Sequence, residues 1–152
     1  MKIKKIIKRF CIFLILGNLI FCDRRAETVS CFPEQRINVS LNLNLPYYAD
    51  KLTKNNGWVY INEQESGTRG LILVRTGVYP NYKFKVYDRN APHLCPSSDT
   101  TLEVKGGIKI VCPKDGAEWI LTDGSPVKTS SLPPKTYPYS YNPATGIISI
   151  YY

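Results

Sequence analysis

The feature that most constrains the fold is a strict two-residue alternation in the stretch INVSLNLNL, residues 37–45. Apolar side chains occupy every second position, and Asn or Ser stands between them. This period is typical of a β-strand with one face buried and the other face in water. Pro46 ends the run, because proline has no amide hydrogen for a strand ladder. One such strand is not stable alone, so the chain must supply others to pair with it.

Short strand-like runs recur along the rest of the sequence, separated by turn residues. Gly106-Gly107, between two alternating runs, predicts a two-residue β-hairpin. Only residues 47–53 favour a helical turn, and no segment has sustained helical periodicity. Residues 37–152 are therefore predicted to form one small all-β domain, an antiparallel sandwich or barrel. The further predicted strands are 58–61, 70–75, 82–88, 101–105, 108–112, 117–122, 137–141 and 147–152.

Residues 1–22 are typical of an export signal. Lysine and arginine come first, and an apolar run from Phe10 to Phe21 follows, which is short for a membrane span. Cys22 comes directly after this run and resembles the lipidated cysteine of a bacterial lipobox. Phe21 departs from that pattern, because a small residue normally stands there. The alternatives to a lipoprotein are an uncleaved anchor or another form of export, and a cytosolic chain.

Much of the chain's positive net charge lies in the predicted export signal and not in the folded part. The net charge of +8 falls to +3 when the five basic residues of positions 1–22 are set aside. The folded part is therefore not expected to bind nucleic acid, and no nucleotide-binding motif is present. Residues 23–36 are polar and form a predicted tether. We expect a protein anchored to the membrane on the extracytoplasmic side of the cell envelope, where disulfides can form.

Two loops, APHLCP at 91–96 and CPKDGA at 112–117, hold the candidate functional residues. Each follows a predicted strand, and together they contain the chain's single histidine, His93, and two of its five cysteines. Common catalytic motifs such as HExxH, GxSxG and the P-loop are absent. An enzyme would have only His93 and Asp115 as an acid–base pair, so we expect a non-catalytic protein.

The stretch from "YDRNAPHLCP" to "KIVCPKDGAEWILTDGSPV" resembles the cluster-binding region of Rieske iron–sulfur proteins. In that family two loops, Cys-x-His and Cys-x-x-His, clamp a two-iron cluster. Residues 112–117, followed by Trp119 and the turn at 124–126, follow the second loop of the family, and the resemblance covers roughly residues 57–152. It implies a Rieske-like β fold with both loops at one tip. Residues 37–52 also look like those of Rieske-like lipoproteins of Bacteroidetes-type bacteria.

The family's four cluster ligands are incomplete in this chain. Ala91 stands at the first cysteine position and Asp115 at the second histidine position, which leaves His93 and Cys112. A standard Rieske centre needs two cysteines and two histidines. The resemblance therefore implies a scaffold without its [2Fe-2S] cluster, and no cofactor is expected.

Three alternatives for the remaining loop residues stay open. High-potential Rieske domains carry a disulfide between their two loops, so the resemblance favours a bridge between Cys95 and Cys112. A metal is the second alternative: His93, Cys95, Cys112 and Asp115 could hold zinc or an unusual iron–sulfur cluster. The third is that these side chains have only structural roles. Cys31, in the tether, has no expected partner and is free or bridges another chain.

These features predict an exported, lipid-anchored, Rieske-like protein that acts as a non-catalytic binding or structural module. The two loops at 91–96 and 112–117 are the expected contact surface for a protein partner. The alternative is an electron-transfer protein that carries a [2Fe-2S] cluster or another metal on unconventional ligands.

Overall fold

The computed structural model describes residues 28–78 and 81–152. The predicted signal segment, Cys22 and the first part of the tether lie outside the described residues, so the prediction of lipidation is not tested. Within the described part of the chain, no helix is long and apolar enough to cross a membrane.

The described residues form β-strands with one short helix, and the predicted all-β class is confirmed. The strands are β1 (Asn38–Asn42), β2 (Trp58–Ile61), β3 (Leu71–Arg75), β4 (Phe84–Asp88), β5 (Glu103–Lys105), β6 (Lys109–Val111), β7 (Glu118–Ile120), β8 (Pro126–Lys128), β9 (Tyr139–Asn142) and β10 (Ile147–Tyr151), and the helix is α2 (Pro46–Leu52).

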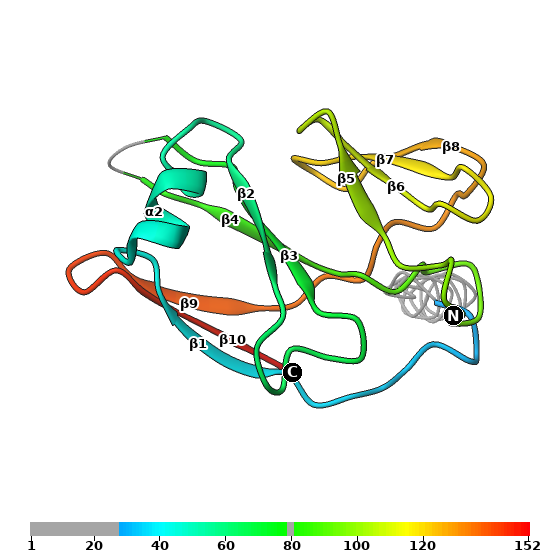
Figure 1. The fold of residues 1–152 in the computed structure, drawn as a ribbon, viewed down its shortest axis with the longest axis horizontal. Helices are drawn as coiled ribbons and strands as arrows, with labels where there is room; N and C mark the ends of the chain where they lie inside the picture. The colour runs from blue at the N-terminus through cyan, green and yellow to red at the C-terminus, as the bar shows by residue number, and fades with distance from the viewer. Residues whose placement is uncertain (1–27, 79–80) are drawn as a thin grey trace, which may run out of the picture.

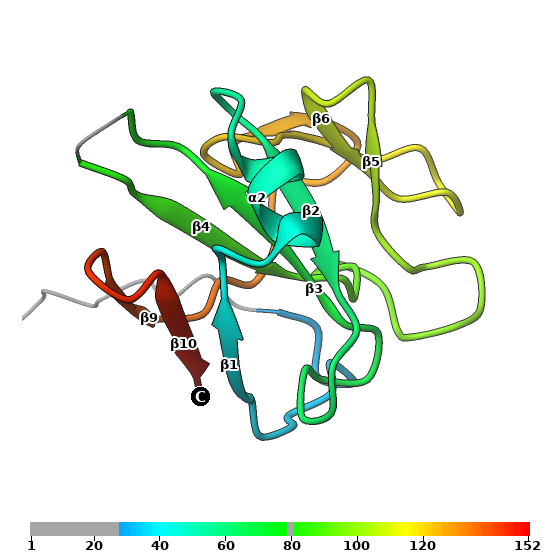
Figure 2. The same ribbon diagram turned by 60° about the vertical axis from the view of Figure 1, so that its left-hand side comes forward.

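The strands pair into three antiparallel sheets, with orders β1-β10-β9, β2-β3-β4 and β5-β6-β7-β8 (Figure 1). β1 pairs with the last strand, which brings both ends of the domain together. The four-stranded sheet and the β1-β10-β9 sheet lie on opposite sides of the β2-β3-β4 sheet (Figure 1). Figure 2 shows α2 beside β2. The predicted small antiparallel β domain is therefore observed.

The apolar run of β3 explains why the domain has three layers. All five residues of β3 are buried, and its side chains alternate between two separate cores. Leu71 and Leu73 pack with residues of β1 and β10, whereas Ile72 and Val74 pack with residues of the four-stranded sheet. The β2-β3-β4 sheet is therefore the middle layer, buried on both faces, and its central strand has no polar face.

The structure corrects three details of the sequence prediction. Pro126 was expected in a turn, but it begins the edge strand β8, where a missing amide hydrogen costs no ladder bond. The Gly106-Gly107 hairpin forms, but Lys105 pairs with Lys109, so three residues separate the strands instead of two. The predicted helical segment, 47–53, forms one residue earlier, because Pro46 starts α2 at a favourable first position and the helix ends at Leu52.

Candidate functional site

The two candidate loops meet at one tip of the four-stranded sheet. The first follows β4 and the second connects β6 to β7. The Nε2 atom of His93 lies 2.6 Å from the Oδ2 atom of Asp115, so a direct hydrogen bond joins the loops. Both side chains are largely covered, with exposed fractions of 14% for His93 and 26% for Asp115. The His93 ring also packs against the Trp119 ring, with 5.5 Å between centroids.

A buried carboxylate at the end of β4 positions the first loop. Asp88 Oδ1 accepts hydrogen bonds from the backbone amide and the side-chain amide of Asn90, at 2.6 and 2.8 Å. Its Oδ2 accepts a third bond from the Tyr137 hydroxyl at 2.6 Å. Burial raises the pKa of Tyr137, and the carboxylate of Asp88 adds to the rise, so the phenol keeps its proton. This network fixes the direction in which the chain leaves the sheet toward His93.

The second loop is a tight turn closed by its own backbone. The Cys112 amide donates to the Ala117 carbonyl at 2.9 Å, and the Ala117 amide donates to Asp115 Oδ1 at 3.1 Å. Gly116 has a φ of +69°, a left-handed conformation that favours glycine. The Asp115 side chain is thus held on both oxygens, one by the turn and one by His93.

The charge state of Asp115 decides which atom of the pair carries the proton. Burial by itself raises the pKa of Asp115. Hydrogen bonds from His93, the Ala117 amide and Cys112 outweigh that effect, and the pKa lies below its usual value. An ionised carboxylate can only accept, so His93 Nε2 carries the proton and donates it. Nδ1 of His93 is buried with no hydrogen-bond partner among the described residues.

Cys112 is a buried thiol in the core between the β2-β3-β4 sheet and the four-stranded sheet. Its side chain has no exposed surface, and it packs with Ala91 and Trp119. Burial raises the pKa of this thiol above its ordinary value, and the Asp115 carboxylate adds to the rise. The Lys114 and Asp115 amides oppose it more weakly. Because the thiolate is the nucleophile and the metal ligand, a protonated, covered Cys112 is a poor candidate for either role.

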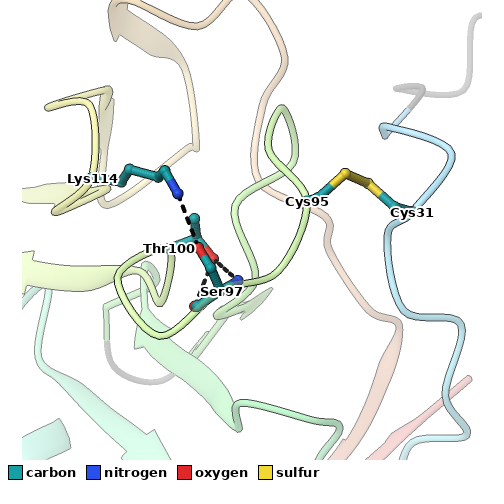
Figure 3. Close-up of a disulfide and its surroundings, with 5 residues drawn as sticks. All are labelled: Cys31, Cys95, Ser97, Thr100 and Lys114. Carbon is teal, nitrogen blue, oxygen red and sulfur yellow. Dashed lines mark hydrogen bonds between the residues drawn. A yellow bond between two sulfur atoms is a disulfide. The ribbon is translucent and has the colours of Figure 1, made fainter.

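The predicted bridge between Cys95 and Cys112 is wrong. The disulfide joins Cys95 to Cys31, with 5.4 Å between their Cα atoms, and Cys112 is a free thiol. Figure 3 shows this bridge between the tether and the first loop. Cys95 lies on the exposed side of its loop, whereas Cys112 lies in the core, so the two sulfurs face different environments. The prediction that Cys31 lacks a partner in its own chain is also wrong.

The path of the tether explains the observed pairing. The Val29 amide donates to the Pro92 carbonyl at 3.0 Å, so the tether runs beside the first loop. Phe32, one residue after the disulfide, is 6% exposed and packs beside Lys135. These contacts bring Cys31 to Cys95.

Lys114 forms a second link between the two loop regions. Its ammonium lies 3.2 Å from Ser97 Oγ and 3.4 Å from Asp99 Oδ1 (Figure 3 shows the contact with Ser97). A hydrogen bond from Ser97 is the main cause that lowers the pKa of Asp99, and Lys114 adds to it. Both charged side chains remain substantially exposed, so their ion pair contributes little to stability.

The described residues do not fit a Rieske cluster or the four-residue metal site considered from the sequence. The Cys95 sulfur is consumed by the disulfide, and Asp115 is engaged by His93. Within residues 28–78 and 81–152, no group of three or more His, Cys, Asp or Glu side chains is arranged to hold a metal ion. The loops meet as predicted, and His93 contacts Asp115, the residue that the sequence analysis named beside it as a possible acid–base pair.

Comparison with known proteins adds little to this geometry. No protein-family model and no curated protein matches the chain. One similar solved structure is a protein described as an NADH-dependent nitrite reductase small subunit from Mycobacterium tuberculosis. It is 14% identical, with coverage of 79% of this chain and 97% of that chain and a TM-score of 0.37. A likeness this distant carries no argument about function.

Proposed function

We propose that this chain is a non-catalytic binding module whose tip, formed by residues 91–99 and 112–117, contacts a protein partner without carrying a metal cluster. The observation that carries the proposal is the hydrogen bond of 2.6 Å between His93 and Asp115. This bond engages the His93 and Asp115 side chains with each other, so neither is free to bind a metal. A ligand set of His93, Cys95, Cys112 and Asp115 would require this bond and the disulfide of Cys95 to be absent.

The links between distant segments at the tip support a role in binding. The disulfide, the His93–Asp115 bond and the contacts of Lys114 each join segments that are distant in sequence. A surface held in one conformation before binding loses little conformational entropy when a partner docks. Lys114 and Asp99 offer exposed charges of opposite sign at this surface.

Export and lipid anchoring at Cys22 are part of the same proposal. The disulfide between Cys31 and Cys95 supports an oxidising, extracytoplasmic compartment, because such bonds are rare in the cytosol. The mass of the N-terminal peptide from the native host tests the anchoring. A diacylglyceryl-type mass increase on Cys22 is expected, and an unmodified residue preceded by Phe21 would contradict it.

Metal content and the visible spectrum test the absence of a cluster. The full-length chain, purified in a mild detergent, is expected to be colourless, with no stoichiometric iron or zinc. The electron-transfer alternative instead requires visible absorption bands and about two irons per chain. Either stoichiometric iron or stoichiometric zinc would overturn the cluster-less tip.

Site-specific photo-crosslinking in the native host tests the binding surface. A photoreactive amino acid in place of Lys114 is expected to give a discrete adduct with one protein. Lys85, an exposed lysine of β4, is the matched control position and should give none. Equal labelling from both positions, or none from position 114, would contradict a docking role for the tip.

A further inference from the structure

A cavity of about 190 Å³ lies between α2, the ends of the middle sheet and the β9–β10 hairpin. Figure 1 shows these elements together at the side of the molecule away from the N-terminal end of the described chain. The cavity is therefore separate from the tip. Its lining is formed by Leu43, Asn44, Ala49, Leu52, Thr53, Arg75, Tyr82, Phe84 and Tyr141.

Arg75, the last residue of β3, is the one charged side chain in this lining. It is only 9% exposed. Its Nη2 donates to the Thr53 carbonyl at 2.6 Å, and its guanidinium lies 5.0 Å from the centre of the Tyr82 ring. Its Nε atom is buried and has no hydrogen-bond partner among residues 28–78 and 81–152. A guanidinium has five N–H donors in a planar fork, so the bond to Thr53 uses only one of them.

In the described part of the chain, no carboxylate forms an ion pair with this buried guanidinium. The ion pairs within the described residues involve other side chains, and no Asp or Glu lines the cavity. Buried charges are normally paired, because removing an ion from water is costly. The Thr53 carbonyl, at the C-terminal end of α2, and the Tyr82 ring supply only partial negative charge.

The other residues that line the cavity indicate which apolar group a bound anion could carry. Leu43, Leu52 and Phe84 are buried apolar residues, and the Phe84 and Tyr141 rings are in edge-to-face contact at 5.1 Å. Small-molecule sites typically combine apolar and aromatic walls with a few convergent polar groups. This cavity is smaller than most such sites, which limits the ligand to about one ring.

We propose that this cavity binds a small organic anion, a carboxylate on a compact aromatic or branched apolar body, with the carboxylate on Arg75 and the body against Phe84 and Tyr141. A planar carboxylate matches the guanidinium fork and supplies the missing counter-charge. The proposal does not depend on the function of the tip.

A purely structural role for Arg75, as a cap for the end of α2, makes different predictions. A cap needs only the bond to Thr53 and would show no preference between an acid and its neutral analogue. A binding site must show that preference. Benzoate and benzamide are suitable probes, because they have the same shape and differ in charge.

The test is a titration of the isotopically labelled full-length chain with each probe, followed by the NMR signals of the arginine Nε–H groups and the backbone amides. Benzoate is expected to give saturable shifts at Arg75, Thr53 and Phe84, with benzamide at least about tenfold weaker. Arg75→Met should reduce benzoate affinity by at least about tenfold. Arg89→Met is the matched control, since Arg89 also lies over a tyrosine ring, Tyr60, but outside the cavity.

A second variant keeps the test valid if Arg75→Met unfolds α2. Ala49→Leu adds a side chain to the cavity from the helix while leaving the guanidinium in place, and leucine is nearly as good a helix former as alanine. It should abolish benzoate binding and preserve the contact between Arg75 and Thr53. No saturable shift at Arg75 up to about 10 mM benzoate, or equal binding of benzamide, would overturn the proposal.

Discussion

Loss of the bridge between Cys31 and Cys95 should destabilise the domain by about 4 kcal/mol. The two cysteines are 64 residues apart in sequence. In the chain-entropy model, a loop of that length removes about 14 cal/mol/K from the unfolded state, which corresponds to about 4 kcal/mol at 25 °C. A domain of this size is stable by only about 5–15 kcal/mol, so the loss is a large fraction of the total.

The assay is equilibrium unfolding in urea, followed by tryptophan fluorescence, since Trp119 is fully buried. The double variant Cys31→Ser/Cys95→Ser should unfold at lower urea than the oxidised wild type. It should match the reduced wild type, because both lack the same cross-link. The bridge acts mainly on the unfolded chain, so contacts such as Val29 with Pro92 can persist in the folded variant.

Cys112→Ala is the matched control. It leaves the disulfide intact and removes only a buried thiol, so it should cost about 1 kcal/mol. A bridge between Cys95 and Cys112 predicts the opposite order. Cys112→Ala would then lose about 3 kcal/mol, and Cys31→Ser would change little. That order, or an unchanged double variant, would refute the pairing and the account of the tether.

Three further predictions concern the tip and its support. Asp115→Asn should lower stability at neutral pH. Because the pKa of Asp115 is held below its usual value, the ionised carboxylate stabilises the fold above about pH 4, and this stabilisation is lost as the pH falls through the lowered pKa. The unfolding free energies of the wild type and the variant should therefore converge in acid. A difference that stays constant with pH would contradict the pairing with His93. Tyr137→Phe should cost about 1–3 kcal/mol in urea unfolding, because Asp88 loses a buried hydrogen bond, and a neutral result would remove Asp88 from the account. Cys112 should resist iodoacetamide at pH 8 in the native protein and react after unfolding, as measured by mass; rapid native labelling would mean that it is exposed.

The all-β class could be predicted because local patterns report it. The alternation at residues 37–45 appears in the structure as β1. Val39 and Leu41 face the core that β1 and β10 share with the middle sheet. The unbroken apolar run of β3 became a central strand buried on both faces. β8 was missed because Pro126 normally argues against a strand, and only its position at the edge of a sheet permits it.

The meeting of the two loops could be predicted through the resemblance, but the disulfide could not. Three cysteines lie in residues 23–152, which allows three intrachain pairings. The choice among them depends on where the tether runs and on which side of its loop Cys95 lies. The hydrogen bond of Val29 and the burial of Cys112 decide both, and neither has a local signal in the sequence.

The cavity at Arg75 also has no sequence signal. An arginine at the end of a strand is ordinarily exposed, but this one is buried, with its guanidinium on the Thr53 carbonyl and over the Tyr82 ring. Such a site depends on three segments that are distant in sequence, so single-sequence patterns do not reveal it.

The central claim, that the tip is closed by His93 and Asp115 and holds no metal, is tested most directly by the imidazole NMR spectrum of His93, the chain's single histidine. At neutral pH we predict sharp signals with a proton on Nε2 that exchanges slowly with water, and its signature should disappear in Asp115→Asn. Paramagnetically broadened signals, or a ring bound to a metal through either nitrogen, would contradict the account.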